Sequence, residues 1–261
     1  MIRFLRLLAL LTCLAGATRA NAQADNPETI ELGLSTDVIS ITSDFSGASL
    51  TIFGALSNFD PQVLRLGRYD VFVVLEGPLT NIVARRKDRI VGMWINVAAQ
   101  QFVNIPASYL VASTRQPRDI TAQETLTQLG LGIDSVRLQP YDRRQNPGSE
   151  DDFRDALRRL KMKSGLFAEF PAGVAFLSQS LFRATLALPA NVPVGEHRAR
   201  AYLFKNGVFV SGANVSLRIQ KSGFEQDVYR FAHDRSLLFG IAAVSLSILT
   251  GWLGRVFFKR D

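Results

Sequence analysis

The stretch "LPANVPVGEHRARAYLFKNGVFV", residues 188–210, decides the fold of this chain. It places Asn206-Gly207 between two runs of β-branched and aromatic residues, and Asn-Gly in that setting predicts a tight β-hairpin. The preceding segment, from Leu188 to Gly195, predicts a strand that ends in a corner. A strand, a corner and a hairpin in this order are typical of the last third of an immunoglobulin-type β-sandwich.

The same β pattern covers the N-terminal third of the chain. Short runs such as "TIELGL", "ASLTIFGAL" and "RYDVFVVLEGP" alternate in polarity and are bounded by Gly, Pro, Ser or Asp. Leu50 and Ile52 should face one side of their strand and Phe53 the other, and residues 71–75 are apolar on both faces, as near a sheet centre. We therefore predict a mainly β fold, an antiparallel immunoglobulin-like sandwich over residues 23–222. Two separate β domains are the alternative.

A helical insertion is predicted at about residues 106–165. Pro106 followed by "ASYLVAS" favours a short helix, because proline suits the first helical position. Thr121 and Glu124 have the spacing of a capping box. The segment "SEDDFRDALRRLKMKSG", residues 149–165, has acids first and bases last, which suits a helix dipole. Its acidic residues are interpreted as caps and its basic face as solvated.

The first 22 residues predict a secretory signal peptide. Arg3 and Arg6 precede an apolar run over residues 7–17, and Ala20-Asn21-Ala22 has the small-x-small pattern of a cleavage site. The apolar run is too short to span a bilayer as a helix. The alternatives are an uncleaved N-terminal anchor and a lipoprotein modified at Cys13, although the residue before Cys13 is not the small one that such sites require.

The C-terminal end predicts a membrane span. Residues 236–254 carry no charge and would form a helix of about 28 Å, enough to cross a hydrocarbon core of about 30 Å. We predict a transmembrane helix over 236–258, after a juxtamembrane helix over 223–235 and before a cytoplasmic tail at 259–261. The basic tail favours this orientation, which puts the sandwich in the periplasm, anchored to the inner membrane.

Composition excludes several classes of function. The formal net charge of +7 falls to +4 without residues 1–22, and an exported domain does not meet cytosolic nucleic acid. The only cysteine is Cys13, so the processed chain would have no disulfide, no thiol nucleophile and no cysteine metal site. Catalytic, zinc and nucleotide-binding motifs are missing from the sequence. His197 is expected as a neutral core residue and His233 at the membrane interface. We predict no enzyme activity, no cofactor and no metal.

Residues 84–96, "ARRKDRIVGMWIN", gather four bases: Arg85, Arg86, Lys87 and Arg89. We interpret the stretch as two strands joined at about Arg86-Lys87-Asp88, with the charges in the turn and Trp94 back in the core. The alternative is an exposed basic tip that contacts an acidic partner surface or anionic headgroups. That alternative leads to a different function, a periplasmic module that binds or senses anions or another ligand.

One resemblance is carried by "LEGPLTNIVARRKDRIVGMWINVAAQQFVNIPASYLVASTRQP", residues 75–117, together with both chain ends. It is similar to the Alph_Pro_TM family of alphaproteobacterial transmembrane proteins. The elements that match are Gly77-Pro78, Arg86-Lys87, Gly92 with Trp94, Pro106, Tyr109 and residues 112–117. The resemblance implies an anchored, exported domain and brings no catalytic residues. It also implies, more weakly, an association with multi-span permeases of the sulfite-exporter type.

The functional prediction is therefore an accessory or interaction subunit for an integral membrane partner. Ala243, Ser247 and Gly251 recur every four residues in the predicted span, so they share one helix face. Small residues let two helices approach closely in a bilayer, which favours this stripe as the contact with the partner. Bulky residues such as Leu238, Ile241 and Leu249 occupy the opposite side and suit lipid.

Overall fold

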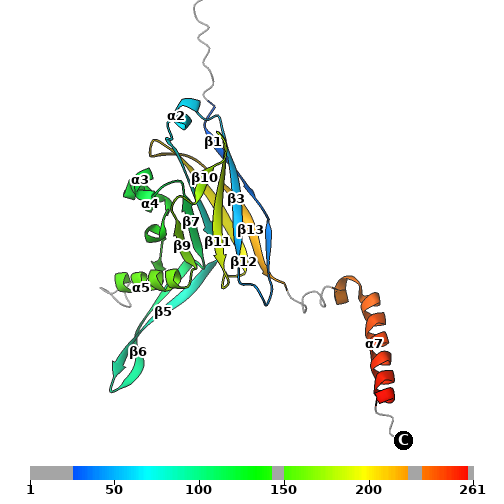
Figure 1. Ribbon diagram of the computed structural model, residues 1–261. Helices are drawn as coiled ribbons and strands as arrows, with labels where there is room; N and C mark the ends of the chain where they lie inside the picture. The colour runs from blue at the N-terminus through cyan, green and yellow to red at the C-terminus, as the bar shows by residue number, and fades with distance from the viewer. Residues whose placement is uncertain (1–25, 143–149, 223–230, 258–261) are drawn as a thin grey trace, which may run out of the picture.

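The computed structural model describes residues 26–142, 150–222 and 231–257. Two sheets face each other as a β-sandwich (Figure 1), so the predicted fold class is confirmed. One sheet has the order β1-β3-β11-β10 and the other the order β2-β13-β12-β4-β7-β9. The strands of the sandwich are β1 (Thr29–Leu34), β2 (Val38–Ile41), β3 (Gly47–Ser57), β4 (Tyr69–Glu76), β7 (Tyr109–Ser113), β9 (Phe167–Phe170), β10 (Val174–Phe176), β11 (Leu181–Pro189), β12 (Gly195–Lys205) and β13 (Val208–Lys221).

Alternation along the strands builds two cores around β4. Leu50 and Ile52 of β3 are buried between the two sheets while Phe53 is exposed, as predicted. Val71 and Val73 of β4 reach the same core. The intervening residues of β4 enter a second core on the outer face of the six-stranded sheet, which confirms that this strand is apolar on both faces because it is covered on both.

The pairing is antiparallel except at two places. Asn206 and Gly207 join β12 to β13 with φ values of 52° and 82°, the geometry of the predicted tight hairpin turn. β2 pairs with β13, and β9 with β7, in parallel, so the six-stranded sheet is mixed. This departure from a fully antiparallel arrangement leaves the sandwich itself unchanged.

A long hairpin leaves the sandwich as an arm. β5 (Leu79–Ile90) and β6 (Met93–Pro106) pair along their whole length, and β8 (Gln139–Pro140) adds a short third strand to β6. Figure 1 shows the outer half of this hairpin projecting beyond the sandwich. We call residues 79–106 the arm.

The turn of the arm corrects two predictions. Lys87 pairs with Asn96, and Ile90 with Met93, so the chain reverses at Val91-Gly92 and not at Arg86-Lys87-Asp88. The four bases therefore lie on β5 and not in the turn. Trp94 was predicted in the core but is 69% exposed, because within the described parts of the chain no second sheet faces the outer half of the arm.

The region predicted as a helical insertion begins with a strand. Tyr109–Ser113, expected as a short helix, forms β7 between β4 and β9 with all five residues buried. Sheet pairing and burial on both faces outweigh the helical signal of Pro106. Thr121 does not cap a helix either, since its hydroxyl donates to the carbonyl of Gly207 at 2.7 Å. The helices are α2 (Pro61–Arg65), α3 (Pro117–Ile120), α4 (Gln123–Leu129), the 3₁₀ turn η1 (Ile133–Ser135), α5 (Glu150–Lys163) and α7 (Ser236–Phe257).

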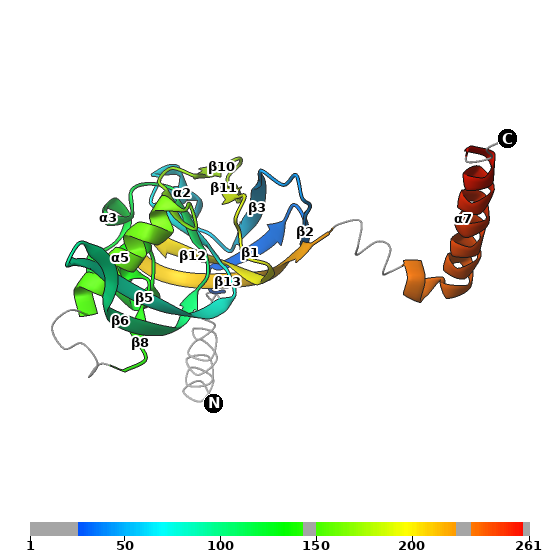
Figure 2. The ribbon, with the colours of Figure 1, turned by 90° about the horizontal axis from the view of Figure 1, so that it is seen from below.

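Helix α5 lies beside the base of the arm (Figure 2). Its Phe153 and Leu157 are buried in the second core together with Phe102 of β6. The basic residues of α5 were predicted to be solvated, but several have partners within the protein. Arg154 pairs with Glu150 and Asp151, Arg158 pairs with Asp155, and the Lys161 ammonium donates to the carbonyl of Ala107 at 2.8 Å.

Candidate interaction site

The arm leaves the sandwich at the end where the chain departs toward α7. Gly195 pairs with Ile219 near the end of β13, and a Cβ at Gly195 would lie 3.1 Å from the Pro78 ring, where the arm begins. The Asn206-Gly207 turn marks the opposite end, since the Asn206 amide donates to the carbonyl of Arg68. The arm and the C-terminal end of β13 are thus neighbours.

The tip of the arm is apolar and exposed. Val91 is 91% exposed, and Met93 and Trp94 beside it are 66% and 69% exposed. Val91 also has a φ of 51°, in the left-handed region that β-branched residues avoid. We call residues 90–95 the arm tip. In water, an exposed apolar residue in this conformation has two unfavourable contributions to its free energy. One is the hydration of its apolar surface, and the other is the strain of its backbone.

The predicted basic residues follow the tip along β5 without converging. Side chains alternate between faces along a strand, so Arg85, Lys87 and Arg89 share one face of the arm and Arg86 lies on the other. Trp94 is directly across from Arg89, on the face with three bases. Those three extend over about 14 Å. All four are exposed. Arg85, Arg86 and Lys87 line one open groove, and Arg89 lies outside it.

A groove lies between α5 and the outer edge of β5, which we call the α5 groove. Six consecutive residues of β5, 82–87, line it together with Asp152, Phe153, Ala156, Leu157 and Leu160, and its volume is about 390 Å³. Because consecutive residues point to opposite faces, a groove that all six line follows the edge of the strand. β5 is the edge strand of its sheet as described, so backbone groups face this groove.

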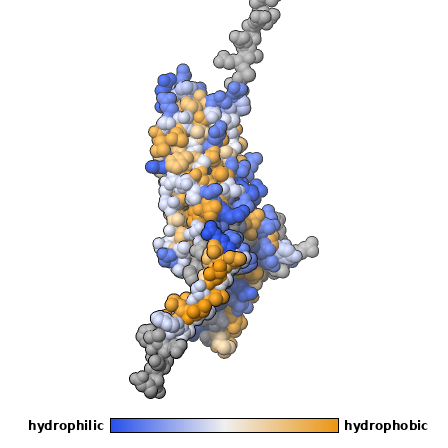
Figure 3. Space-filling model, turned by 90° about the vertical axis from the view of Figure 1, so that its right-hand side faces the viewer, coloured by the Kyte–Doolittle hydropathy of each residue, from blue (hydrophilic) through white to orange (hydrophobic). Residues whose placement is uncertain are grey.

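Helix α7 is long and apolar enough to cross a membrane over Ser236–Gly254, and the described parts of the protein bury none of that window. Most of its surface in Figure 3 is hydrophobic. Ala243, Ser247 and Gly251 lie on one face as predicted from their spacing, and the Ser247 hydroxyl donates to the Ala243 carbonyl at 2.9 Å. Gly240 and Gly254 fall on the same face at helical spacing and lengthen the stripe.

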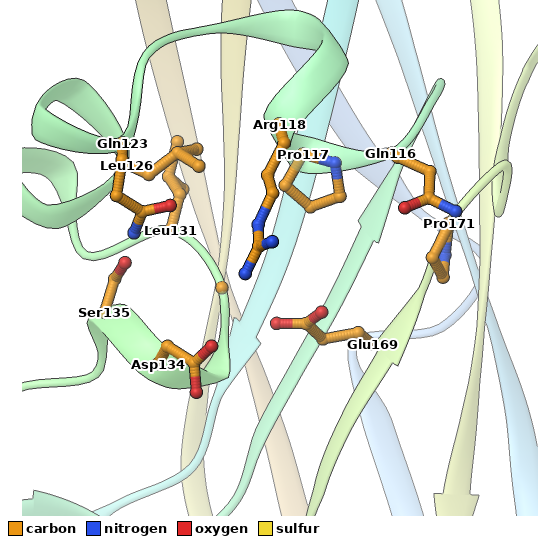
Figure 4. A pocket seen from close by; sticks show the side chains of 11 residues that line it. Gln116, Pro117, Arg118, Gln123, Leu126, Leu131, Asp134, Ser135, Glu169 and Pro171 are labelled. Atoms are coloured by element: carbon orange, nitrogen blue, oxygen red, sulfur yellow. The ribbon is translucent and has the colours of Figure 1, made fainter.

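A second cleft, of about 230 Å³, is polar (Figure 4). Arg118 points into it toward the carboxylates of Asp134 and Glu169. Glu169 accepts a hydrogen bond from the backbone N–H of Ile133 at 2.5 Å, which holds the η1 turn against β9. Among residues 26–142, 150–222 and 231–257 there is no group of three His, Cys, Asp or Glu that could hold a metal ion. The hydrogen bond from Ile133 gives Glu169 a structural role in this cleft.

His197 is buried at the base of the arm. Its Nε2 lies 3.3 Å from the Ser108 hydroxyl and its Nδ1 lies 3.3 Å from the carbonyl of Gly195. Burial lowers the pKa of His197 below its ordinary value, and the contact with Gly195 opposes that shift. Ser108 is 2% exposed and His197 is 0% exposed, so this pair has no access to a substrate. The histidine is a core residue, as predicted.

The profile of one protein family matches residues 29–260, nearly the whole chain. That family is described as "Putative transmembrane protein (Alph_Pro_TM)". The chain belongs to this family. An Alph_Pro_TM protein with α7 as its candidate span is a membrane-anchored protein, attached near its C-terminal end. Among curated proteins none matches the chain.

Three solved structures share 9% sequence identity with this Alph_Pro_TM protein. The sporulation control protein Spo0M of Bacillus subtilis matches 80% of this chain with a TM-score of 0.27, and this chain covers 55% of its length. AggA, the major subunit of aggregative adherence fimbriae type I of Escherichia coli, matches 76% with a TM-score of 0.24, and 96% of AggA is covered. The C-terminal domain of the AgI/II polypeptide BspA of Streptococcus agalactiae matches 75% with a TM-score of 0.24, and half of that chain is covered. Scores this low carry no argument about function.

Two features of the Alph_Pro_TM chain were missed from the sequence. The α5 groove joins segments separated by more than sixty residues, and no local pattern reports that proximity. The apolar arm tip did leave a signal: "IVGMWI" contains a Gly-based turn with no polar residue on either side. Turns that face water usually carry Asn, Asp or Ser, so a wholly apolar turn indicates contact with something else.

Proposed function

We propose that this protein is a non-enzymatic accessory subunit that binds an extramembrane segment of an integral membrane protein, such as a permease of the sulfite-exporter type. The observation that carries the proposal is the α5 groove, an apolar groove along an open strand edge in a membrane-anchored protein. In this proposal a secretory signal peptide at residues 1–22 exports the sandwich to the periplasm, and α7 anchors it in the inner membrane. Residues 1–25 and 258–261 lie outside the described residues, so cleavage and the cytoplasmic tail rest on the sequence alone.

The partner segment would bind as an added strand. The edge of β5 offers unpaired backbone N–H and C=O groups, which favour an extended peptide. Leu160 of α5 is 64% exposed beside this edge and would cover apolar side chains of the segment. Arg86 also lines the groove, on the face of β5 opposite Arg85 and Lys87, and favours an acidic residue in the segment. The expected partner segment is thus extended and apolar, with an acidic side chain opposite Arg86.

Site-specific photocrosslinking in the native membrane tests this proposal. A photoreactive amino acid at Leu160 should crosslink to a multi-span membrane protein. The matched control is Leu66, which is equally exposed at 65% but follows α2, far from the groove. A crosslink from Leu160 alone supports the proposal. Equal crosslinking from both positions, or none from Leu160, contradicts it.

Within the bilayer we propose that the stripe of Ala243, Ser247 and Gly251 packs against a helix of the same partner. Small side chains allow the close helix approach that drives association in lipid. This contact is independent of the α5 groove, so each can be removed separately. The residues expected to face lipid lie on the opposite side of α7, among them Leu249.

A further inference from the structure

We propose that the arm tip is a second membrane contact. Its apolar side chains enter the lipid surface on the sandwich side of the bilayer that α7 spans, and Arg85, Lys87 and Arg89 bind the headgroups of anionic lipids. The inference depends on the membrane span and on the geometry of the arm. It does not depend on the partner proposed above.

A comparison of the two hairpin turns in this chain gives the first argument. Val91-Gly92 and Asn206-Gly207 have nearly the same backbone, with φ values of 51° and 82° in one and 52° and 82° in the other. Asn is the residue that this turn geometry favours in water. At the arm tip the same position holds a β-branched apolar residue that is 91% exposed. Exposure of the Val91 side chain to water is unfavourable, and transfer of that side chain into lipid removes this cost.

The order of side chains along the arm gives the second argument. Val91 and Met93 lie at the end, Trp94 and Arg89 come next as a cross-strand pair, and Lys87 and Arg85 follow. A bilayer presents hydrocarbon, then an interface that favours tryptophan, then charged headgroups in the same order. Asp88 interrupts the bases, but it lies on the opposite face of the strand from Trp94. From the tip inward the arm thus presents apolar side chains, then Trp94 level with Arg89, then the bases Lys87 and Arg85, in the order that a membrane surface favours.

Chain length gives the third argument. The arm starts at the end of the sandwich from which β13 leads toward α7. Fourteen residues separate Lys221 from Ser236, so the sandwich end lies at most about 50 Å from the start of the span. The twelve residues of β5 extend about 40 Å from the same end. The tether therefore allows the sandwich to lie within about 40 Å of the membrane, the length of the arm, and at that separation the arm tip reaches the lipid surface.

Quenching of Trp94 by lipid tests the proposal on the full chain. Trp94 and Trp252 are the only tryptophans, so Trp252→Phe leaves Trp94 as the reporter. The protein is reconstituted in vesicles of phosphatidylethanolamine with phosphatidylglycerol, with and without bromine on the acyl chains. We expect brominated lipid to reduce Trp94 emission, because an indole at the interface lies within reach of the bromine atoms. Val91→Asp with Met93→Asp should abolish this reduction.

Two controls show whether the quenching reports contact of the arm tip with lipid. A tryptophan at Val208, which is 67% exposed beside the Asn206-Gly207 turn, in a chain with Trp94→Phe and Trp252→Phe, should not be quenched. All substituted tip residues are exposed, so an unchanged thermal unfolding transition of the sandwich shows that the variants fold. The proposal is overturned if brominated lipid does not quench Trp94 emission while iodide in solution quenches it freely.

The role of the bases is tested in the same assay. Replacing Arg85, Lys87 and Arg89 with glutamine should reduce the quenching in phosphatidylglycerol vesicles to the level seen in pure phosphatidylcholine. Quenching that is identical in both lipids for both proteins overturns the headgroup assignment. Protection of Trp94 only after a membrane protein is added would show that a protein, and not lipid, covers the arm tip.

Discussion

Replacing Val91 with asparagine should strengthen the arm and weaken its membrane contact at the same time. Val91 has a φ of 51°, and a left-handed conformation costs an ordinary L-residue about 1–2 kcal/mol. Asparagine tolerates this conformation, as Asn206 does in the other hairpin. We therefore expect the free energy of opening the arm tip to rise by about 1 kcal/mol. Burying a valine fully is favourable by about 1.5–3 kcal/mol, so the lipid contact should weaken about tenfold.

Hydrogen exchange and lipid quenching measure the two effects separately. Backbone amides of Ile90 and Met93, which flank the turn, should exchange about fivefold more slowly in Val91→Asn, because 1.4 kcal/mol corresponds to a factor of ten. Asn206→Val is the mirror control: it should speed exchange at its own turn and leave Trp94 quenching unchanged. Faster exchange at the arm tip in Val91→Asn would refute the reasoning about strain. Unchanged quenching by brominated lipid would refute the reasoning about lipid.

Three further predictions concern other parts of the molecule. Asp70 is 2% exposed and accepts hydrogen bonds from Thr114 and Arg115, so Asp70→Ala should lower the free energy of unfolding in urea by about 1.5–3 kcal/mol; a change below that range would mean that solvent replaces both partners. The pKa of His197 is lowered in the fold, so the unfolded chain binds the proton first and stability should fall as pH drops below about 6.5. In thermal unfolding measured at several pH values, stability should fall less steeply with decreasing pH in His197→Gln than in the parent. Equal slopes for the two proteins would contradict this prediction. Ser247→Leu with Gly251→Leu should abolish co-purification of the membrane partner while Leu249→Ala has little effect; recovery of the partner at the parent yield would mean that the stripe faces lipid.

The sandwich could be predicted because strands such as β3 carry one buried face each. Alternation at Leu50, Ile52 and Phe53 leaves only one orientation that hides the large residues from water. The Asn206-Gly207 turn then fixes the register of β12 and β13. These signals are local, so a single sequence contains them.

The errors arise where burial depends on distant parts of the chain. Tyr109–Ser113 is apolar throughout, and a short apolar run suits a buried helix as well as a buried strand. Trp94 was predicted as a core residue because tryptophan is usually buried. Its exposure arises because the arm extends beyond the sandwich, and the residues around Trp94 in the sequence do not indicate that length. Thr121 has the spacing of a cap and instead bonds to Gly207, eighty-six positions away in sequence.

The candidate site divides in the same way. The bases on β5 and the apolar span could be found from the sequence, and the α5 groove could not, because it forms only when α5 meets the edge of β5. Two residues of the stretch 112–117, which carries part of the family resemblance, have a structural role in the fold. Thr114 and Arg115 both bind the buried carboxylate of Asp70, at 2.7 and 2.9 Å. That stretch is therefore structural.

The position of β13 has a mechanical consequence. This fourteen-residue strand is hydrogen-bonded to β12 on one side and to β2 on the other, and its last residue, Lys221, is the point from which the chain continues to the membrane. A pull from the membrane acts along the strand, at right angles to its interstrand hydrogen bonds. Such a load shears many rungs of the ladder together and does not peel them apart one by one. The sheet is thus arranged to resist tension at its tether.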